Sequence, residues 1–302
     1  MISRFSSALF LVVSLLLGAT NANAQRMQQV FATPEVAMEQ FGNAVQTKDL
    51  DGLSLMLGED YKDIIPEPTK VDYQRFVAAW NSAHGLIIEG PNLAHISVGT
   101  NGWTLPIPLA KISMGWIFDM DRADKEIDAR QIGANELSTI KAMLAYGDAQ
   151  REYQSADRTG GGVLQYAQKL QSTPGTKDGL YWPTNANEPR SPIGQYFAQS
   201  KSIDGLDRRG FHGYQYRILT AQGPAAKGGA RSYIQNRHMT QGFALIAWPV
   251  EYDKTGVMSF IVNQDGIVYQ KNLGPETNSV VRNINRFNPD NTWTQVSEAD
   301  LK

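Results

Sequence analysis

The sequence predicts an α+β protein made of two successive units, and three observations support this class. Helical spacing of apolar residues in the first hundred positions gives way to short runs rich in β-branched and aromatic residues. One long helical stretch follows, at about 122–156. After residue 212, further β-rich runs are separated by turn residues. We therefore expect helices and a curled antiparallel sheet over 25–121, then a long helix packed on an antiparallel sheet over 122–302.

The first 24 residues have the pattern of a secretory signal. Arg4 precedes an apolar run, Ala8–Leu17, and small residues then lead to Ala22-Asn23-Ala24. We expect cleavage near Ala24 and a periplasmic or secreted protein, with an uncleaved N-terminal anchor as the alternative. The run is short for a membrane span, which takes about 20 apolar residues. No later stretch is apolar enough to cross a bilayer, so we expect no membrane span in the mature chain.

Composition limits the classes of partner. The chain has 28 basic and 30 acidic residues, and loss of Arg4 with the signal leaves 27 and 30, a net charge of −3. This balance gives no indication of a nucleic-acid partner or of a polybasic membrane patch. There is no cysteine, which excludes disulfides, thiolate metal sites and cysteine nucleophiles. Stability must therefore come from hydrophobic cores.

Local signals place the elements of the first unit. Thr33 is suited to cap a helix that has Pro34 in its first position. Asn101-Gly102 is typical of a tight hairpin turn, and Pro106 and Pro108 put the strand after it at an edge or a bulge. The elements expected from residue spacing are short helices at about 50–57 and 71–82, and strands at 93–98, 103–109 and 111–120.

The second unit begins with the long helix, whose apolar stripe is not a strict heptad. A second helix is expected at 163–171, after three consecutive glycines, and then a loop-rich tract at 172–210. Tyr214–Leu219 alternates in a way that predicts one buried face of a strand. The remaining expected elements are strands within 243–250, 257–262 and 267–271 and a helix at about 276–287.

Several segments resemble a known family. The chain contains "EIDARQIGANELSTIKAMLAYGDAQREY", "FHGYQYRILTAQGPAAKGGA" and "GFALIAWPVEYDKTGVMSFIVNQDGIVYQKNLGP". These segments resemble a widespread bacterial secreted family, catalogued as domain of unknown function 2950, over nearly all of the mature chain. The resemblance implies secretion and brings no activity, cofactor or catalytic residue.

Two weaker resemblances concern the fold. Helices followed by curled strands, with "AVQTKDLDGLSLML", resemble the cone fold of nuclear transport factor 2 and its relatives. A long helix, a variable loop tract and strands ending in "SFIVNQDGIVY" resemble the globular heads of type IV pilins and type II secretion pseudopilins. These resemblances imply a cone-like first unit and a pilin-head-like second unit.

A search for catalytic residues finds none. The histidines are His84, His95, His212 and His238, and no two have the spacing of a zinc site. There is no nucleophile elbow and no phosphate-binding loop. Asp265 lies in Asn-Gln-Asp-Gly between two β-rich runs. Because Gly266 is able to take a positive φ, we interpret Asp265 and Gly266 as a structural turn.

Calcium is the one cofactor that the sequence loosely suggests, and no metal site is predicted. Oxygen ligands for calcium usually recur at alternate positions with a glycine bend. One loose set is Asp119, Asp121 and Glu126, for which a charged helix start is the plainer interpretation. A second set is Asp178, Asn185, Asn187 and Glu188.

Aromatic side chains are the most abundant candidates for binding a ligand. The residues predicted to contact it are Trp80, Trp103, Trp116, Tyr181 and Trp182. Core packing is the plainer role for aromatics at such spacing. We expect an exported, non-enzymatic envelope protein that binds a protein, a peptide or a small apolar ligand. The alternatives are an isomerase- or hydratase-like enzyme using the cone pocket, with candidates His84, His95 and Asp63, or a secretion- or pilus-associated subunit.

Overall fold

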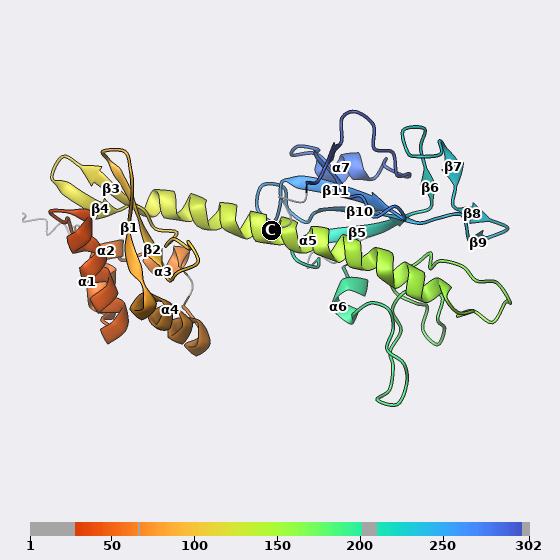
Figure 1. The fold of residues 1–302 in the computed structure, drawn as a ribbon, viewed down its shortest axis with the longest axis horizontal. Coiled ribbons are helices and arrows are strands. Elements are labelled where there is room, and N and C mark those ends of the chain that lie inside the picture. Colours follow the sequence, from red (N-terminus) through yellow and green to blue (C-terminus); the bar gives the residue numbers. More distant parts are fainter. Residues whose placement is uncertain (1–27, 66, 201–209, 298–302) are drawn as a thin grey trace, which may run out of the picture. The chain divides into compact units, whose positions relative to one another are not determined.

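The computed structural model describes residues 28–65, 67–200 and 210–297. The predicted signal segment, 1–24, lies outside the described residues, as do residues 201–209 of the predicted loop tract. The chain divides into two compact units, Met1–Ala123 and Asp124–Lys302. Each unit has a hydrophobic core of its own, and each combines helices with an antiparallel sheet (Figure 1). The class is therefore mixed α+β, as predicted.

Unit 1 combines short helices with a four-stranded antiparallel sheet of order β1-β2-β3-β4. The first helix begins where the sequence predicts, because Oγ1 of Thr33 accepts the N–H of Val36 at 3.4 Å and Pro34 follows the cap. The elements are α1 (Pro34–Thr47), α2 (Leu50–Leu57), α3 (Tyr61–Ile64), α4 (Lys70–Ser82), β1 (His84–Glu89), β2 (Leu93–Val98), β3 (Leu109–Ile112) and β4 (Gly115–Phe118).

The sheet of unit 1 corrects two predicted strands. The single strand expected at 111–120 is wrong, because β3 and β4 form a hairpin there. Gly115 takes a φ of 145° in that hairpin, which a bulkier residue rarely adopts. The strand expected at 103–109 is reduced to a bridge between Ser97 and Thr104. Pro106 and Pro108 have no N–H with which to extend the ladder.

Unit 2 is organised around α5 (Met120–Gln154), which contacts a five-stranded antiparallel sheet of order β13-β12-β11-β10-β5 (Figure 1). The hydroxyl of Tyr146 on α5 donates to the Ala244 carbonyl at 3.2 Å. The hydroxyl of Tyr216 donates to Thr139 Oγ1 at 3.1 Å. The strands of the sheet are β5 (Tyr214–Leu219), β10 (Ala244–Pro249), β11 (Met258–Asn263), β12 (Tyr269–Asn272) and β13 (Thr294–Gln295).

Smaller elements complete unit 2. Two pairs of two-residue strands form separate hairpins beside the main sheet. These elements are α6 (Gln195–Ala198), α7 (Thr277–Val281), β6 (Ala221–Gln222), β7 (Arg231–Ser232), β8 (Ile234–Gln235) and β9 (His238–Met239). The final helix expected at 276–287 therefore ends early, at Val281. The short helix α6 falls within the predicted loop tract.

Strand β5 has a buried face, as its alternation predicts, and its other face is covered as well. Every residue of β10, its neighbour in the sheet, is buried. Tyr216 faces α5, whereas Arg217 donates from Nη2 to the carbonyls of Val281 and Ile284 at 2.7 and 2.8 Å. A sheet covered on both faces loses the alternation that marks a half-exposed strand.

The helix expected at 163–171 does not form. The buried amide of Gln150 on α5 pairs with both backbone groups of Ala167: Nε2 donates to its carbonyl and Oε1 accepts its N–H, each at 2.8 Å. Further along, Gln171 bridges Tyr181 in parallel register. Because these backbone groups are used in tertiary contacts, the segment has an extended path despite its helical spacing.

No helix within the described residues is both long enough and apolar enough to cross a bilayer.

Candidate ligand site at the end of helix α5

The aromatic residues predicted to bind ligand in unit 1 are mostly core residues. Trp80 is 3% exposed and Trp116 is 8% exposed. The Trp80 ring stacks on His84 with centroids 4.5 Å apart and packs against Phe76. Trp103 is 41% exposed and also contacts Phe76, edge to face. Trp80 and Trp103 thus share a neighbour but do not form one exposed aromatic surface.

The candidate acid–base residues of unit 1 are engaged separately. Nδ1 of His84 lies 2.9 Å from the backbone carbonyl of Trp80. Nε2 of His95 lies 3.0 Å from a carboxylate oxygen of Glu89. Asp63 belongs to the short helix α3. In the described part of unit 1, no hydrogen bond or ion pair joins any two of the three candidates.

The carboxylates that loosely suggested calcium at the start of α5 have other partners. Oδ1 of Asp119 accepts a hydrogen bond from the backbone N–H of Arg122 at 3.0 Å. Its Oδ2 forms an ion pair with the Arg122 guanidinium. Glu126 pairs with Arg130 at 2.8 Å, and Asp121 is exposed. Over residues 28–65, 67–200 and 210–297, no group of three or more His, Cys, Asp or Glu side chains is placed to hold a metal ion.

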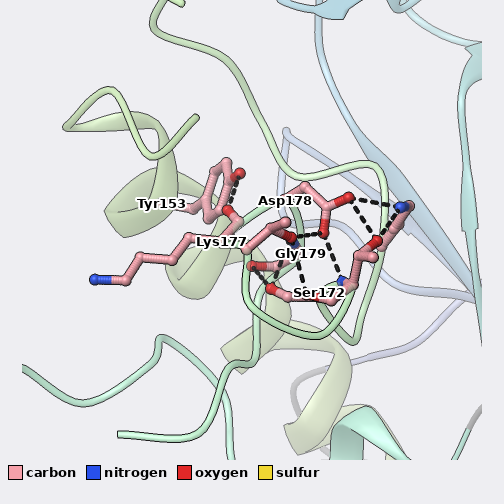
Figure 2. Close-up of polar contacts among 8 residues, drawn as sticks. Tyr153, Ser172, Lys177, Asp178 and Gly179 are labelled. Atoms are coloured by element: carbon pink, nitrogen blue, oxygen red, sulfur yellow. Dashed lines mark hydrogen bonds and ion pairs between the residues drawn. The ribbon is translucent and has the colours of Figure 1, made fainter. Parts of the chain in front are cut away.

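Asp178 organises a compact loop at residues 172–179 (Figure 2). Its Oδ1 accepts hydrogen bonds from the Thr173 N–H at 2.7 Å and from the Thr176 hydroxyl at 2.9 Å. Its Oδ2 accepts from Lys169 Nζ at 2.6 Å and from the Thr173 hydroxyl at 2.9 Å. Burial alone would raise the pKa of Asp178, but these hydrogen bonds outweigh it and hold the pKa well below its usual range. All acceptor positions are filled by the protein itself.

The same loop has a close backbone approach at Gly179. Its N–H donates to Ser172 Oγ at 3.0 Å, and the Ser172 hydroxyl donates to the Gly179 carbonyl at 3.2 Å (Figure 2). A Cβ on Gly179 would lie 2.7 Å from the backbone carbon of Gln171 and the nitrogen of Ser172. Only glycine fits this loop without a backbone shift.

A second loop, residues 155–162, is organised by Asp157 in a similar way. Its carboxylate accepts the backbone N–H groups of Thr159, Gly160 and Gly162 at 3.1, 2.9 and 2.7 Å. The hydrogen bond from Gly162 is the largest cause that lowers the pKa of Asp157. Both loops therefore use one aspartate to bind their own chain.

Each aspartate stands next to a basic residue that lies over the ring of Trp182. The guanidinium carbon of Arg158 is 5.7 Å from the ring centroid, and Nζ of Lys177 is 5.5 Å from it. Trp182 is 5% exposed and packs edge to face on Tyr153 of α5. We call Tyr153, Arg158, Lys177 and Trp182 the Trp182 cluster.

Tyr153 fixes the loop at 172–179 to the end of α5. Its hydroxyl donates to the carbonyl of Lys177 at 2.7 Å (Figure 2). Burial, followed by the charges of Asp178 and Asp157, raises the pKa of Tyr153 to about 12, although Arg158 acts in the opposite direction. The phenol is therefore neutral at neutral pH and acts as a hydrogen-bond donor.

The two cations of the Trp182 cluster have no carboxylate partner among the described residues. Nη2 of Arg158 donates to the Glu152 carbonyl at 3.5 Å, and its Nε is buried without a hydrogen-bond partner. In Figure 2 the Lys177 ammonium points away from the hydrogen bonds around Asp178. The cluster therefore offers positive charge and hydrogen-bond donors.

The other predicted residues of this tract surround the cluster or lie outside it. Tyr181 is half-buried and its N–H donates to the Leu170 carbonyl at 2.9 Å. Glu188 accepts the N–H of Asn185 at 3.2 Å, and Asn187 is exposed. The prediction therefore named the tryptophan and Asp178 but missed Tyr153, Arg158 and Lys177. In the sequence, an aspartate stands directly beside a basic residue in two turn-rich segments, Asp157-Arg158 and Lys177-Asp178. This pattern could have pointed to the missed residues.

Asp265 and Gly266 lie in the turn between β11 and β12. The Gly266 N–H donates to the Asn263 carbonyl at 3.0 Å, and Gly266 has a φ of 75°. The Asp265 N–H donates to Asn263 Oδ1 at 3.1 Å, and its carboxylate accepts from the Asn263 amide at 3.2 Å. These contacts are those of a side-chain-stabilised turn.

Comparison with known proteins identifies the family. The model of a family described as protein of unknown function, DUF2950, matches residues 28–296. The chain belongs to the DUF2950 family. Neither the curated proteins nor the solved structures that were searched gave a match. The family match extends over both units and includes every residue of the Trp182 cluster.

Proposed function

We propose that this chain is an exported envelope protein that binds a ligand or partner, without catalysing a reaction, at the Trp182 cluster of unit 2. One observation carries the proposal. Two loops, each held by its own aspartate, bring Arg158 and Lys177 to the same tryptophan, and neither cation has a carboxylate partner among the described residues. Loops held rigidly in this way are typical of binding sites, since less order has to be gained on binding.

Export is proposed from the sequence alone. The basic start, the apolar run and the small residues before Gln25 support a cleaved signal. If the proposal is right, the protein recovered from a periplasmic or culture fraction begins at Gln25, which N-terminal sequencing determines. Recovery only with an intact N-terminus in the membrane fraction would contradict cleavage and favour an anchor.

An enzyme in unit 1 is the weaker candidate. Such an enzyme would bring an acid and a base together in one pocket. His84 contacts a backbone carbonyl, and His95 contacts Glu89 at the surface. The observed contacts therefore do not join the candidates His84, His95 and Asp63. The cone-like form of unit 1 remains a proposal that rests on the order of its helices and strands.

A secretion- or pilus-associated role rests on the pilin-head likeness of unit 2, which also remains a proposal. That role would favour an exposed apolar surface along α5. Leu144, at 36%, is the large apolar residue of α5 that is clearly exposed in the described structure. A single exposed leucine gives little support to assembly through this helix.

Site-specific photo-crosslinking tests the binding proposal. A photoreactive residue is placed at Ala156, in the loop at 155–162, or at Pro183, which follows Trp182. A matched control is placed at Lys254, elsewhere in unit 2, and all three residues are exposed. The protein is irradiated in its native envelope extract and its adducts are identified by mass spectrometry. We expect the same adduct at both loop positions and not at Lys254. Equal labelling at the control, or none at the loops, would refute the proposal.

A further inference from the structure

The Trp182 cluster also indicates the chemical class of its ligand. The two flanking loops have a similar construction, in which an aspartate accepts hydrogen bonds from its own loop and the adjacent basic residue lies over the ring. Asp178 is neutralised by Lys169 at 2.6 Å, and the oxygens of Asp157 accept three backbone N–H groups. The two aspartates therefore stabilise their loops. They form no ion pair with Arg158 or Lys177, whose positive charges can interact with a ligand.

The free donor on Arg158 gives a second, independent indication. Its Nε is buried and has no hydrogen-bond partner. A buried donor without an acceptor is unfavourable to the fold, because the hydrogen bond that it lost to water is not replaced. Because this atom is closed to solvent, an anionic oxygen reaches it only when the guanidinium turns outward. Planar guanidinium groups bind carboxylate and phosphate through paired hydrogen bonds.

The burial of Trp182 argues against an apolar ligand. The ring is 5% exposed and already lies close to two cations. A ligand reaching the cluster therefore contacts the cations before it contacts the ring. We propose, on the basis of the binding function above, that Arg158 and Lys177 hold a small anion that carries a carboxylate or a phosphate group.

Calorimetric titration of the purified full chain tests this inference. Sodium pyrophosphate and sodium citrate are titrated separately at low ionic strength. We expect at least one of them to bind and to weaken about tenfold or more in Arg158→Gln and in Lys177→Gln, since one charged hydrogen bond contributes roughly 1.5–3 kcal/mol. Binding should also weaken at higher salt, where charges are screened. Binding of pyrophosphate alone, citrate alone or both supports the proposal and assigns the group.

The matched control is Lys271→Gln. Lys271 also lies over a tryptophan, 5.9 Å from the Trp293 centroid, but Nζ donates to Thr292. Its loss should leave anion binding unchanged. If Arg158→Gln does not fold, as judged by circular dichroism, the exposed Lys177 carries the test alone.

Two results would overturn the inference. One is the absence of heat with both anions, and the other is binding that both charge-removing variants leave intact. If either result is obtained but crosslinking at the loop positions persists, the proposed binding function still holds. The ligand then belongs to another chemical class. Loss of crosslinking would refute the function itself.

Discussion

Single glycines decide whether the loops at the Trp182 cluster form. Gly179 touches backbone, whereas Gly133 on α5 has open space where a Cβ would stand. Gly179→Ala should therefore lower the free energy of unfolding by about 2 kcal/mol or more, through a backbone shift. Gly133→Ala should raise it by about 0.5–1 kcal/mol, because alanine is the better helix former. Chemical denaturation of the two variants measures both, and equal effects would contradict the close approach at Gly179.

Tyr153 links stability to alkaline pH. Its folded pKa is about 12, above the value near 10 of an unfolded tyrosine. Stability from the neutral phenol is therefore fully present below pH 10 and is lost as pH rises towards 12. Tyr153→Phe should be less stable at neutral pH by about 1 kcal/mol, from the lost hydrogen bond to Lys177. It should also lose less stability between pH 9 and 11, which thermal unfolding across that range checks.

At the scale of elements, the loop held by Asp178 should respond to acid. Its folded pKa lies below the unfolded value, so its stabilising effect is present above about pH 4 and is lost as pH falls below that. Hydrogen exchange in residues 172–179 should accelerate in acid, after correction for the intrinsic rate. Asp178→Asn should show fast exchange already at pH 6, and pH-independent protection of the wild-type loop would contradict this.

Element prediction succeeded where the signal was local. The cap at Thr33 and the helix at 50–57 follow from residues that act on their immediate neighbours. The helix expected at 163–171 failed because a distant side chain, Gln150, takes both backbone groups of Ala167. The alternation of β5 indicates one buried face, but it does not show that a second layer covers the other face as well. Neither effect is visible in local periodicity.

The candidate site was predictable only in part for the same reason. Trp182 and Asp178 stand out as residue types, but the placement of Arg158 and Lys177 over one ring depends on how two separate loops fold back on the end of α5. Trp80 and Trp116 were predicted to contact a ligand because they are tryptophans, yet both are buried. Burial in a core is decided by tertiary packing, which residue type does not fix.

For the whole molecule, the two separate cores predict two unfolding transitions. Ile96 belongs to the core of unit 1 and Ile246 to that of unit 2, and both are fully buried. Replacing either by alanine should lower the stability of its own unit by about 2–5 kcal/mol. In scanning calorimetry, Ile96→Ala should shift one transition and Ile246→Ala the other. A single transition moved by both substitutions would mean that the units unfold together.

The Trp182 cluster at the end of α5 is proposed to bind a component of the envelope. Hydrogen exchange of the full chain, with and without a soluble envelope extract, tests it most directly by mass spectrometry of peptides. We predict slower exchange in residues 155–162 and 172–182 when the extract is present, with no change at 251–256 in a distant loop of unit 2. Unchanged exchange in both loops, or protection confined to other segments, would contradict the claim.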